Sequence, residues 1–295
     1  MTFLFFILVI LPTLSCSLPF IVLHGIGDQC SNRGITKFTQ ELTYLSNSQG
    51  FCIEIGNGAW DSWFMPLLQQ TQSVCNQVKK MKQLRNGYNI VGLSQGNLIG
   101  RGVVEICDGG PQVKNLVSLG GPHAGTASVP LCGNMDAYLQ HCRFLPKVNN
   151  EVPDERNSTY KDRFSSLQNL VLIMFEQDTV LIPKETAWFG YFPYGEFTPA
   201  LAPQQTKLYI DDWIGLKTLD EAGRVKYINV SGNHLEISEK DIKKHVIPYL
   251  KDDDIQEITI DDEIEKVALL EGYSTYTWPP SINNFFSDLF ERARQ

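Results

Sequence analysis

The sequence lacks the features by which proteins bind nucleic acid. Its 295 residues carry 25 Lys and Arg against 33 Asp and Glu, which gives a net charge of −8, and no stretch is strongly basic. Because a protein needs a basic surface to bind a phosphate backbone, we expect no nucleic-acid partner.

Zinc motifs and membrane spans are also lacking. No Cys-x-x-Cys pair or Cys/His cluster has zinc spacing, so we expect no metal site. The apolar run at residues 2–14 is too short for a comfortable membrane span, and small residues follow it at 15–17. We interpret residues 1–17 as a cleaved signal peptide, with a buried N-terminal strand or helix as the alternative. We expect no transmembrane anchor in the mature chain.

Cysteines and sequons point to the secretory pathway. Cleavage near Ser17 leaves an even number of cysteines, which suggests disulfides in a secreted chain. The six are Cys30, Cys52, Cys75, Cys107, Cys132 and Cys142. Glycosylation sequons begin at Asn157 and Asn229. These signals agree with the predicted signal peptide.

Apolar runs of strand length recur along the chain, with helix-length stretches between several of them. Buried parallel strands have this character, because both of their faces are covered. The predicted strands lie at residues 18–23, 51–55, 89–91, 115–119, 170–175 and 225–230, and helical stretches at 65–81 and 97–107. The alternation predicts an α/β fold with a mostly parallel central sheet flanked by helices.

The most informative segment is Gly-Leu-Ser-Gln-Gly at residues 92–96. It separates a predicted strand from a predicted helix, which is the context of the nucleophile elbow in an α/β-hydrolase fold. The serine of an elbow is strained, so its neighbours must lack side chains for the strand and the helix to pass each other. The segment therefore predicts a serine hydrolase with Ser94 as nucleophile.

The α/β-hydrolase interpretation divides the chain into three parts. Residues 1–17 are the signal peptide, and residues 18–250 are the catalytic domain. Residues 121–169 lack the alternation of strands and helices, and we expect a helical insertion there, after the fifth or sixth strand. Residues 251–295 form an acidic C-terminal extension.

A serine hydroxyl becomes nucleophilic when a histidine takes its proton and a carboxylate orients that histidine. In elbow hydrolases the order along the chain is Ser, then Asp or Glu, then His, each after a strand. Asp178 follows the strand at 170–175, and His234 follows the strand at 225–230. We predict Ser94, Asp178 and His234 as the catalytic triad, with Glu176 as the alternative acid.

The other histidines fit the triad less well. His24 and His123 adjoin glycine-rich loops at earlier strand ends, His141 lies beside a cysteine in the insertion, and His245 lies in a helical pattern. None of these positions matches the late loop that carries the base.

The oxyanion hole needs two backbone N–H groups aimed where negative charge develops. One should come from Gln95, directly after the nucleophile. The loop after the first strand, residues 24–27, should supply the other, with Ile26 as the donor.

With these residues in place, the chain resembles the palmitoyl-protein thioesterases, lysosomal α/β-hydrolases that remove fatty acyl groups from cysteine. The resemblance extends over residues 18–250. It is carried by the segments 24–28, 87–89, 92–96, 115–121, 188–190, 215–217 and 233–235. It implies the triad and the oxyanion hole given above.

The resemblance also implies disulfides and a glycosylation site. The implied pairs are Cys75–Cys107 and Cys132–Cys142, and the implied glycosylation site is Asn157. Asn229 lies close to the triad histidine in sequence, and we expect its sequon to be unused.

This chain departs from the family at two positions. The family has adjacent cysteines where this chain has Cys30 and Ser31, so Cys30 pairs with Cys52 or stays free. The glycine that follows the elbow in the family is Asn97 here.

The implied function is hydrolysis of the thioester in S-palmitoylated proteins or peptides, in the lysosome, in a vacuole or outside the cell. This chemistry needs no metal and no organic cofactor. The first alternative is a lipase or carboxylesterase that uses the same triad on oxygen esters. The second is an inactive module that kept the fold and binds lipid or glycoprotein.

Overall fold

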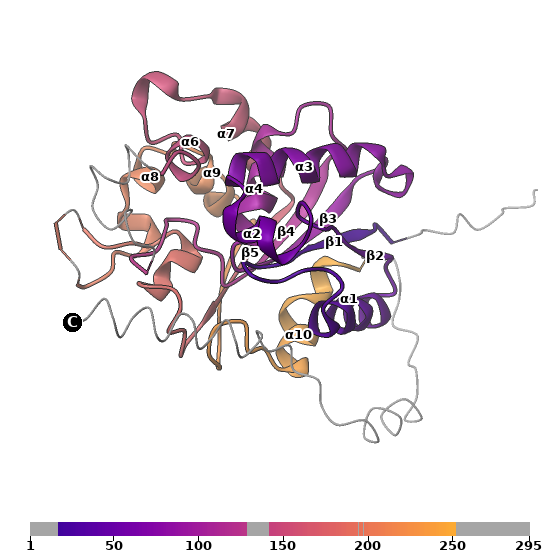
Figure 1. The fold of residues 1–295 in the computed structure, drawn as a ribbon. Helices are drawn as coiled ribbons and strands as arrows, with labels where there is room; N and C mark the ends of the chain where they lie inside the picture. The colour runs from indigo at the N-terminus through magenta and orange to yellow at the C-terminus, as the bar shows by residue number, and fades with distance from the viewer. Residues whose placement is uncertain (1–16, 129–141, 194, 197, 252–295) are drawn as a thin grey trace, which may run out of the picture.

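The structure is a computed structural model that describes residues 17–128, 142–193, 195–196 and 198–251. At its centre lies a six-stranded sheet with the strand order β2-β1-β3-β4-β5-β6, in which every neighbouring pair is parallel (Figure 1). The strands are β1 (Phe20–Leu23), β2 (Gly50–Cys52), β3 (Tyr88–Leu93), β4 (Val113–Leu119), β5 (Asn169–Phe175) and β6 (Val225–Val230). The predicted α/β fold with a mostly parallel sheet is confirmed.

Burial follows the position of each strand in the sheet. All residues of β1 and β3 are buried, as are six of the seven in β5, whereas all of the edge strand β2 and half of the edge strand β6 are intermediate. The central strands are apolar on both faces because helices cover both faces. Each fully buried Leu, Ile, Val or Phe contributes about 1.5–3 kcal/mol relative to an exposed one.

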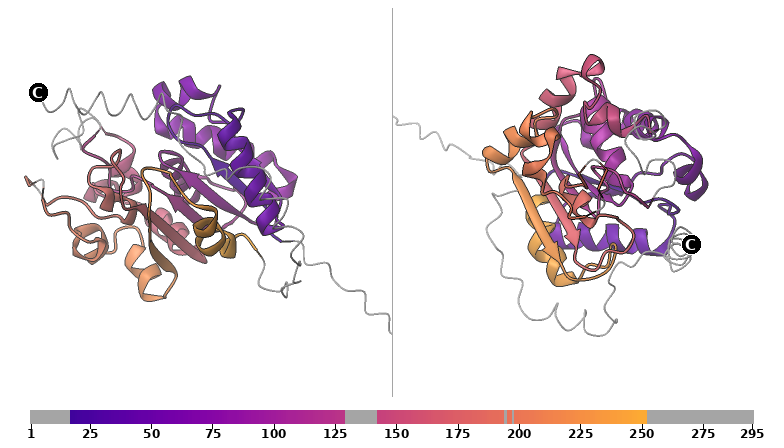
Figure 2. Two further views of the ribbon diagram at one scale, coloured as in Figure 1. Left: turned by 90° about the horizontal axis from the view of Figure 1, so that it is seen from below. Right: turned by 90° about the vertical axis from the view of Figure 1, so that its left-hand side faces the viewer.

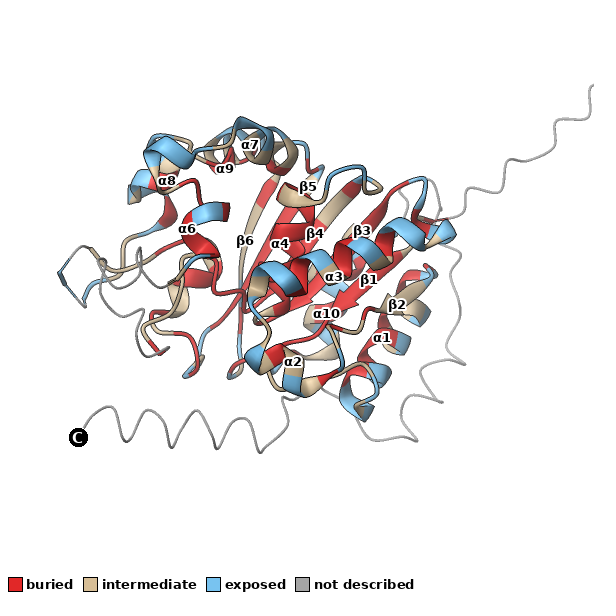
Figure 3. Ribbon diagram, turned by 45° about the horizontal axis from the view of Figure 1, so that its top comes forward, coloured by how far each residue is buried: buried red, intermediate tan, exposed pale blue. Residues whose placement is uncertain are grey.

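Two layers of helices enclose the sheet (Figures 1 and 2). On one face α1 (Arg33–Ser46) and α10 (Glu239–His245) share a hydrophobic cluster with the sheet, through Phe38, Leu42 and Ile242. The helices on the other face are α3 (Leu67–Lys80), α4 (Gly96–Ile106), α7 (Ser158–Ser165) and α9 (Leu216–Glu221). The outer faces of α1 and α3 carry exposed residues, while the strands between the layers are buried (Figure 3).

The insertion lies between β4 and β5. Its described part contains α6 (Leu145–Val148), the 3₁₀ helix η2 (Pro153–Glu155) and α7, so it is helical as predicted. The predicted place after the fifth or sixth strand is wrong for the described sheet, in which four strands precede the insertion. The apolar runs before residue 121 form four strands, at residues 20–23, 50–52, 88–93 and 113–119, and no other strand lies between them in the described chain.

Shorter helices complete the described chain. They are α2 (Ala59–Phe64), α8 (Lys207–Ile210) and the 3₁₀ helices η1 (Lys82–Leu84), η3 (Lys184–Trp188), η4 (Pro203–Gln205) and η5 (Ile247–Tyr249). Among the residues that the structure describes, no helix combines the length and the apolar character needed to cross a bilayer. The predicted signal peptide, except Ser17, and the acidic extension, except Lys251, lie outside the described residues.

Disulfides brace the N-terminal half of the domain. Cys75 on α3 is bonded to Cys107 at the end of α4, the pairing that the resemblance implied. Cys30 is bonded to Cys52, which decides between the two alternatives left by the sequence. Cys142 is also disulfide-bonded, and its expected partner at position 132 lies outside the described residues.

Candidate active site

Ser94 lies in the turn between β3 and α4 with a φ of 51°. This left-handed conformation is uncommon for residues other than glycine and marks a strained turn. Close contacts explain the flanking glycines. A Cβ on Gly92 would lie 2.2 Å from Oδ1 of Asn97, and a Cβ on Gly96 would lie 2.2 Å from the carbonyl oxygen of Leu23. The turn has the geometry of a nucleophile elbow.

Asn97 ties this elbow to the end of β4. Its buried side chain donates through Nδ2 to the carbonyl of Ser94 at 3.1 Å and to that of Leu119 at 2.9 Å. The N–H of Ser94 donates to the same Leu119 carbonyl at 2.9 Å. The asparagine therefore adds two hydrogen bonds that a glycine could not make.

Asp178 and His234 come from the loops after β5 and β6. Nδ1 of His234 lies 2.6 Å from Oδ2 of Asp178, and both side chains are 1% exposed. Oδ1 of the same carboxylate accepts from the backbone N–H groups of Val180 and Leu181. Glu176, the alternative acid, is exposed. The histidine therefore has Asp178 as its carboxylate partner.

The end of β4 places His234 beside the elbow. Leu119 accepts the N–H of Ser94, and a Cβ on the next residue, Gly120, would lie 3.0 Å from Cε1 of His234. The three residues predicted as a triad thus lie together at the carboxyl edge of the sheet.

Two further histidines are engaged in other contacts. Nε2 of His24 lies 2.9 Å from Oε1 of Glu54, and Nε2 of His123 lies 2.8 Å from Oγ of Ser118. His245 is the last residue of α10, where burial lowers its pKa. The remaining histidine, at position 141, lies outside the described residues.

The loop after β1 lies directly against the serine. A Cβ on Gly25 would lie 3.2 Å from Cβ of Ser94 and 3.9 Å from its Oγ. Ile26 follows in this loop, and Gln95 is the N-cap of α4, whose N-terminal dipole favours negative charge. Neither the N–H of Ile26 nor that of Gln95 has an acceptor among the described residues. Both predicted donors therefore lie near Ser94 without an intramolecular acceptor in the described part of the chain.

The short helix α2 braces this arrangement. Its Ser62 accepts the N–H of Gly27 through Oγ at 2.7 Å and the side chain of Gln95 through its carbonyl at 2.8 Å. The outer side of α2 carries Trp60 and Phe64, which are 75% and 72% exposed and stack with ring centroids 5.3 Å apart. The sequence did not predict this exposed pair, because large aromatic residues are usually buried in the core.

A buried polar network lies behind the elbow, on α4. Arg101 and Glu105 form an ion pair that is fully buried, with Nη2 3.0 Å from Oε1. Arg101 also donates to Asn149 of the insertion at 2.9 Å. Burial raises the pKa of Glu105 to about 7, against the opposing effect of Arg101, while burial and the Arg101 charge lower the pKa of His123 well below its usual value. The network fixes the insertion to the helix that follows the serine.

The two sequons differ in their surroundings. Asn157 caps α7, where its side chain accepts the N–H of Thr159 at 2.9 Å. Asn229 lies on the edge strand β6 and is exposed. Glycosylation of the first and not of the second stays a prediction.

A comparison with known families decides among the hydrolases that share such a site. The family model described as palmitoyl protein thioesterase matches residues 19–136 and 132–234. The chain belongs to the palmitoyl-protein thioesterase family. The matched residues contain the elbow and both predicted partners of its serine, so the resemblance noted in the sequence is confirmed.

Curated relatives of the family match over most of their length. Palmitoyl-protein thioesterase 1 of Caenorhabditis elegans is 31% identical over 262 residues, which cover 74% of this chain and 87% of the relative. Palmitoyl-protein thioesterase 3 of Dictyostelium discoideum is 30% identical over 278 residues, covering 80% and 93%. The lysosomal thioesterase PPT2 homolog of Drosophila melanogaster is 25% identical over 249 residues, covering 70% and 82%.

Proposed function

We propose that this chain is a serine hydrolase that removes long-chain fatty acyl groups, such as palmitoyl, from S-acylated cysteines of proteins or peptides. Membership of the family supports the substrate class. The observation that carries the chemistry is the 2.6 Å contact between His234 and Asp178, beside a strained serine elbow.

The proposed acylation step begins at Ser94. Nε2 of His234 takes the hydroxyl proton as Oγ attacks the thioester carbonyl, and Asp178 stabilises the imidazolium through Nδ1. The N–H groups of Ile26 and Gln95 donate to the oxyanion. When the carbonyl re-forms, the carbon–sulfur bond breaks, and the cysteine thiolate takes the proton from His234.

Deacylation repeats these roles with water. His234 takes a proton from water, which attacks the acyl-serine, and the second oxyanion is held by the same two backbone donors. Collapse releases the fatty acid and returns the proton to Oγ of Ser94. This chain's own residues supply every proton transfer.

The acyl chain needs an apolar surface near the serine, because each buried methylene contributes about 0.8 kcal/mol to binding. We assign part of this surface to Trp60 and Phe64. They are large, apolar and exposed, and their helix contacts both oxyanion loops through Ser62.

We also propose where the chain acts. Residues 1–17 direct it into the secretory pathway and are removed, and the mature chain acts in a lysosome or vacuole or outside the cell. The disulfides suit an oxidising compartment during folding, and the Drosophila relative is named a lysosomal thioesterase.

The deciding experiment compares a palmitoyl thioester with its matched oxygen ester, using wild-type protein and Ser94→Ala. We expect thioester turnover that clearly exceeds oxyester turnover and that disappears in the variant. A preference for the oxygen ester would identify a lipase or carboxylesterase. Undiminished activity of Ser94→Ala would show that another residue is the nucleophile. If the wild-type protein is inactive and a fluorophosphonate does not label it, the chain is a binding module.

A further inference from the structure

The loop at residues 24–30 must be rigid for the proposed mechanism to work. A backbone N–H stabilises an oxyanion only when it already points to where the charge develops. Ile26 lies inside this loop, and a Cβ on its neighbour Gly25 would be 3.2 Å from Cβ of Ser94. The contacts that hold this loop in place therefore determine how well the N–H of Ile26 can donate to the oxyanion.

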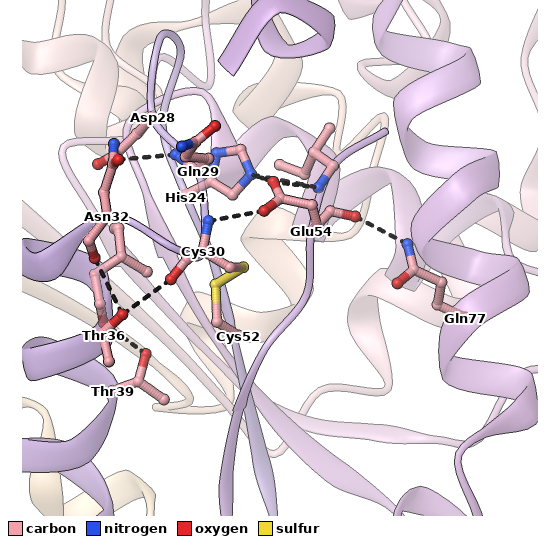
Figure 4. The surroundings of a disulfide bond; sticks show 12 residues. His24, Asp28, Gln29, Cys30, Asn32, Thr36, Thr39, Cys52, Glu54 and Gln77 are labelled. Carbon is pink, nitrogen blue, oxygen red and sulfur yellow. Dashed lines mark hydrogen bonds and ion pairs between the residues drawn. A yellow bond between two sulfur atoms is a disulfide. The ribbon is translucent and has the colours of Figure 1, made fainter. Parts of the chain in front are cut away.

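Glu54 contacts both ends of this loop (Figure 4). Its Oε1 lies 2.9 Å from Nε2 of His24, the first residue after β1, and its Oε2 accepts the N–H of Cys30 at 3.0 Å, three residues before α1 begins. His24 is fully buried, and the Glu54 side chain is 34% exposed. One carboxylate thus joins two loop positions that are six residues apart.

The charge of Glu54 is maintained by the same contacts. Burial alone would raise the pKa of its carboxyl, but the hydrogen bonds from His24, Cys30 and Ile55 outweigh burial and lower that pKa below its usual value. The contacts therefore favour the ionised form of this carboxyl, which is the form that accepts both hydrogen bonds.

The residue that makes these contacts is itself fixed. The carbonyl of Glu54 accepts Nε2 of Gln77 from α3 at 2.9 Å. The preceding residue, Ile53, donates its N–H to Val22 of β1 at 3.1 Å. Glu54 therefore connects the loop to two well-packed elements.

The Cys30–Cys52 disulfide is a second tie at the end of the same loop. It joins the loop to β2, whose Cys52 pairs with Val22 in the sheet. His24, Cys30 and Glu54 offer ligand atoms within 4.8 Å of one another, but Sγ of Cys30 bonded to Cys52 is not a metal ligand. The contacts of His24, Cys30 and Glu54 therefore restrain the loop after β1 and do not form a metal site.

We propose that Glu54 is a positioning residue for the oxyanion hole, and that it acts together with the Cys30–Cys52 disulfide by fixing both ends of the loop that carries Ile26. This inference rests on the proposed function, in which the N–H of Ile26 binds the oxyanion. Glu54 should therefore help to stabilise the transition state, which raises kcat, and should contribute little to substrate binding.

The first test compares Glu54→Ala and Glu54→Gln with wild type on two substrates, a palmitoyl thioester and p-nitrophenyl butyrate. We expect kcat of Glu54→Ala to fall roughly 10- to 100-fold on both, below the loss for a missing oxyanion donor, with KM changed less than about threefold. Glu54→Gln retains one acceptor oxygen and should show a smaller loss. Affinity for a trifluoromethyl ketone, whose serine adduct carries an oxyanion, should fall by the same factor as kcat.

Asp212→Asn is the matched control. Its carboxylate also accepts backbone N–H groups, those of Lys217 and Thr218, but it does so at the start of α9. It should lower the melting temperature without lowering kcat. The proposal is overturned if Glu54→Ala and Glu54→Gln also lose only stability, with kcat and ketone affinity within twofold of wild type.

The second test adds the disulfide. If both ties hold the same loop, Glu54→Gln combined with Cys30→Ser and Cys52→Ser should lose more activity than the product of the separate losses. A purely multiplicative result would mean that the two act on different structures and would overturn their joint role. If wild type hydrolyses the butyrate ester and not the thioester, the proposed substrate is wrong, while the butyrate comparison still tests Glu54.

Discussion

The two sides of the active site are built differently. The serine side consists of the loops after β1 and β3, with Ser94 and both proposed oxyanion donors, and the Cys30–Cys52 bridge braces the loop after β1. The histidine side consists of the loops after β5 and β6. There hydrogen bonds join the loops: Asn233 accepts the N–H and the hydroxyl of Thr179, and Gln177 and Gly232 bond to each other twice.

This difference matches what each side is proposed to supply. Backbone N–H groups cannot adjust to a ligand by rotating a side chain, so their loops must be held rigidly. A histidine base works once a carboxylate fixes its tautomer and orientation, and Oδ2 of Asp178, the proposed partner, lies 2.6 Å from Nδ1 of His234. We therefore expect the serine side to depend on backbone rigidity and the histidine side on one polar contact.

The largest expected effect breaks that contact. Asp178→Asn keeps the shape of the side chain but favours the wrong histidine tautomer, and kcat should fall about 10⁴-fold. Glu176→Gln, two residues away and exposed, is the control and should retain wild-type activity. Steady-state kinetics on the palmitoyl thioester measures both. The reverse result would make Glu176 the acid and would contradict the assignment made here.

The next prediction tests the serine side. Asn97→Ala removes the side-chain hydrogen bonds to the carbonyls of Ser94 and Leu119. We expect kcat to fall roughly 10-fold as the elbow loosens, and the free energy of unfolding to fall by about 1–2 kcal/mol.

Asn115→Ala is the control for that substitution. Asn115 lies near the start of β4, away from the Leu119 end that Asn97 contacts, and donates to the Tyr249 carbonyl at 3.0 Å. It should lose similar stability with kcat unchanged. Equal losses of kcat in both variants would mean that general loosening, and not the elbow, limits activity.

Much of the site was predictable from the sequence because its signals are local. A strand, a Gly-x-Ser-x-Gly turn and a helix occupy consecutive residues, and the loops after β5 and β6 carry Asp178 and His234 directly after apolar runs. The order of these segments and the rule for parallel sheets place them at one edge. The side-chain contact between Asp178 and His234 follows from that placement.

Features that depend on non-local packing were not predictable. Cys30 pairs with Cys52 because β2 lies beside β1, an adjacency that the sequence pattern does not encode. Arg101 and Glu105, spaced as a solvated helical pair would be, are fully buried instead because Asn149 and its neighbours in the insertion cover them. Two charges inside an apolar helical stretch were the one available signal.

A smaller effect, on KM, is expected from the exposed aromatic residues of α2, which lies against the loops of the serine side. Trp60→Ser with Phe64→Ser should raise KM for the palmitoyl thioester about fivefold, because apolar contact with the acyl chain is lost. KM for a butyryl thioester should not change. Ile210→Ser on α8, which also removes an exposed apolar side chain, is the control. Equal increases for both chain lengths would place the acyl chain on another surface.

The smallest expected effect concerns the helices that follow the two sides, α1 after the β1 loop and α10 after the β6 loop. Burial, and then the nearby Glu239 of α10, raise the pKa of Glu41 on α1 to about 7, against the opposing charge of Lys243. The folded pKa is thus above the ordinary value of 4.5, and the folded state binds more protons than the unfolded state between these two pH values. The contribution of Glu41 to the stability of the folded state is therefore greatest below pH 4.5 and is lost as pH rises through 7.

Glu41→Gln removes this loss and tests the contact between the two helices. We expect the variant to be more stable than wild type at pH 8 by on the order of 1 kcal/mol, which raises Tm by about 2–4 °C in a domain of this size. The gain should shrink as pH falls and vanish near pH 4.5, with Glu176→Gln as the exposed control. Thermal unfolding at several pH values measures it. A gain in stability that is independent of pH would mean that ionisation of Glu41 does not destabilise the folded state. The charges of α1 and α10 would then have no measurable effect on each other.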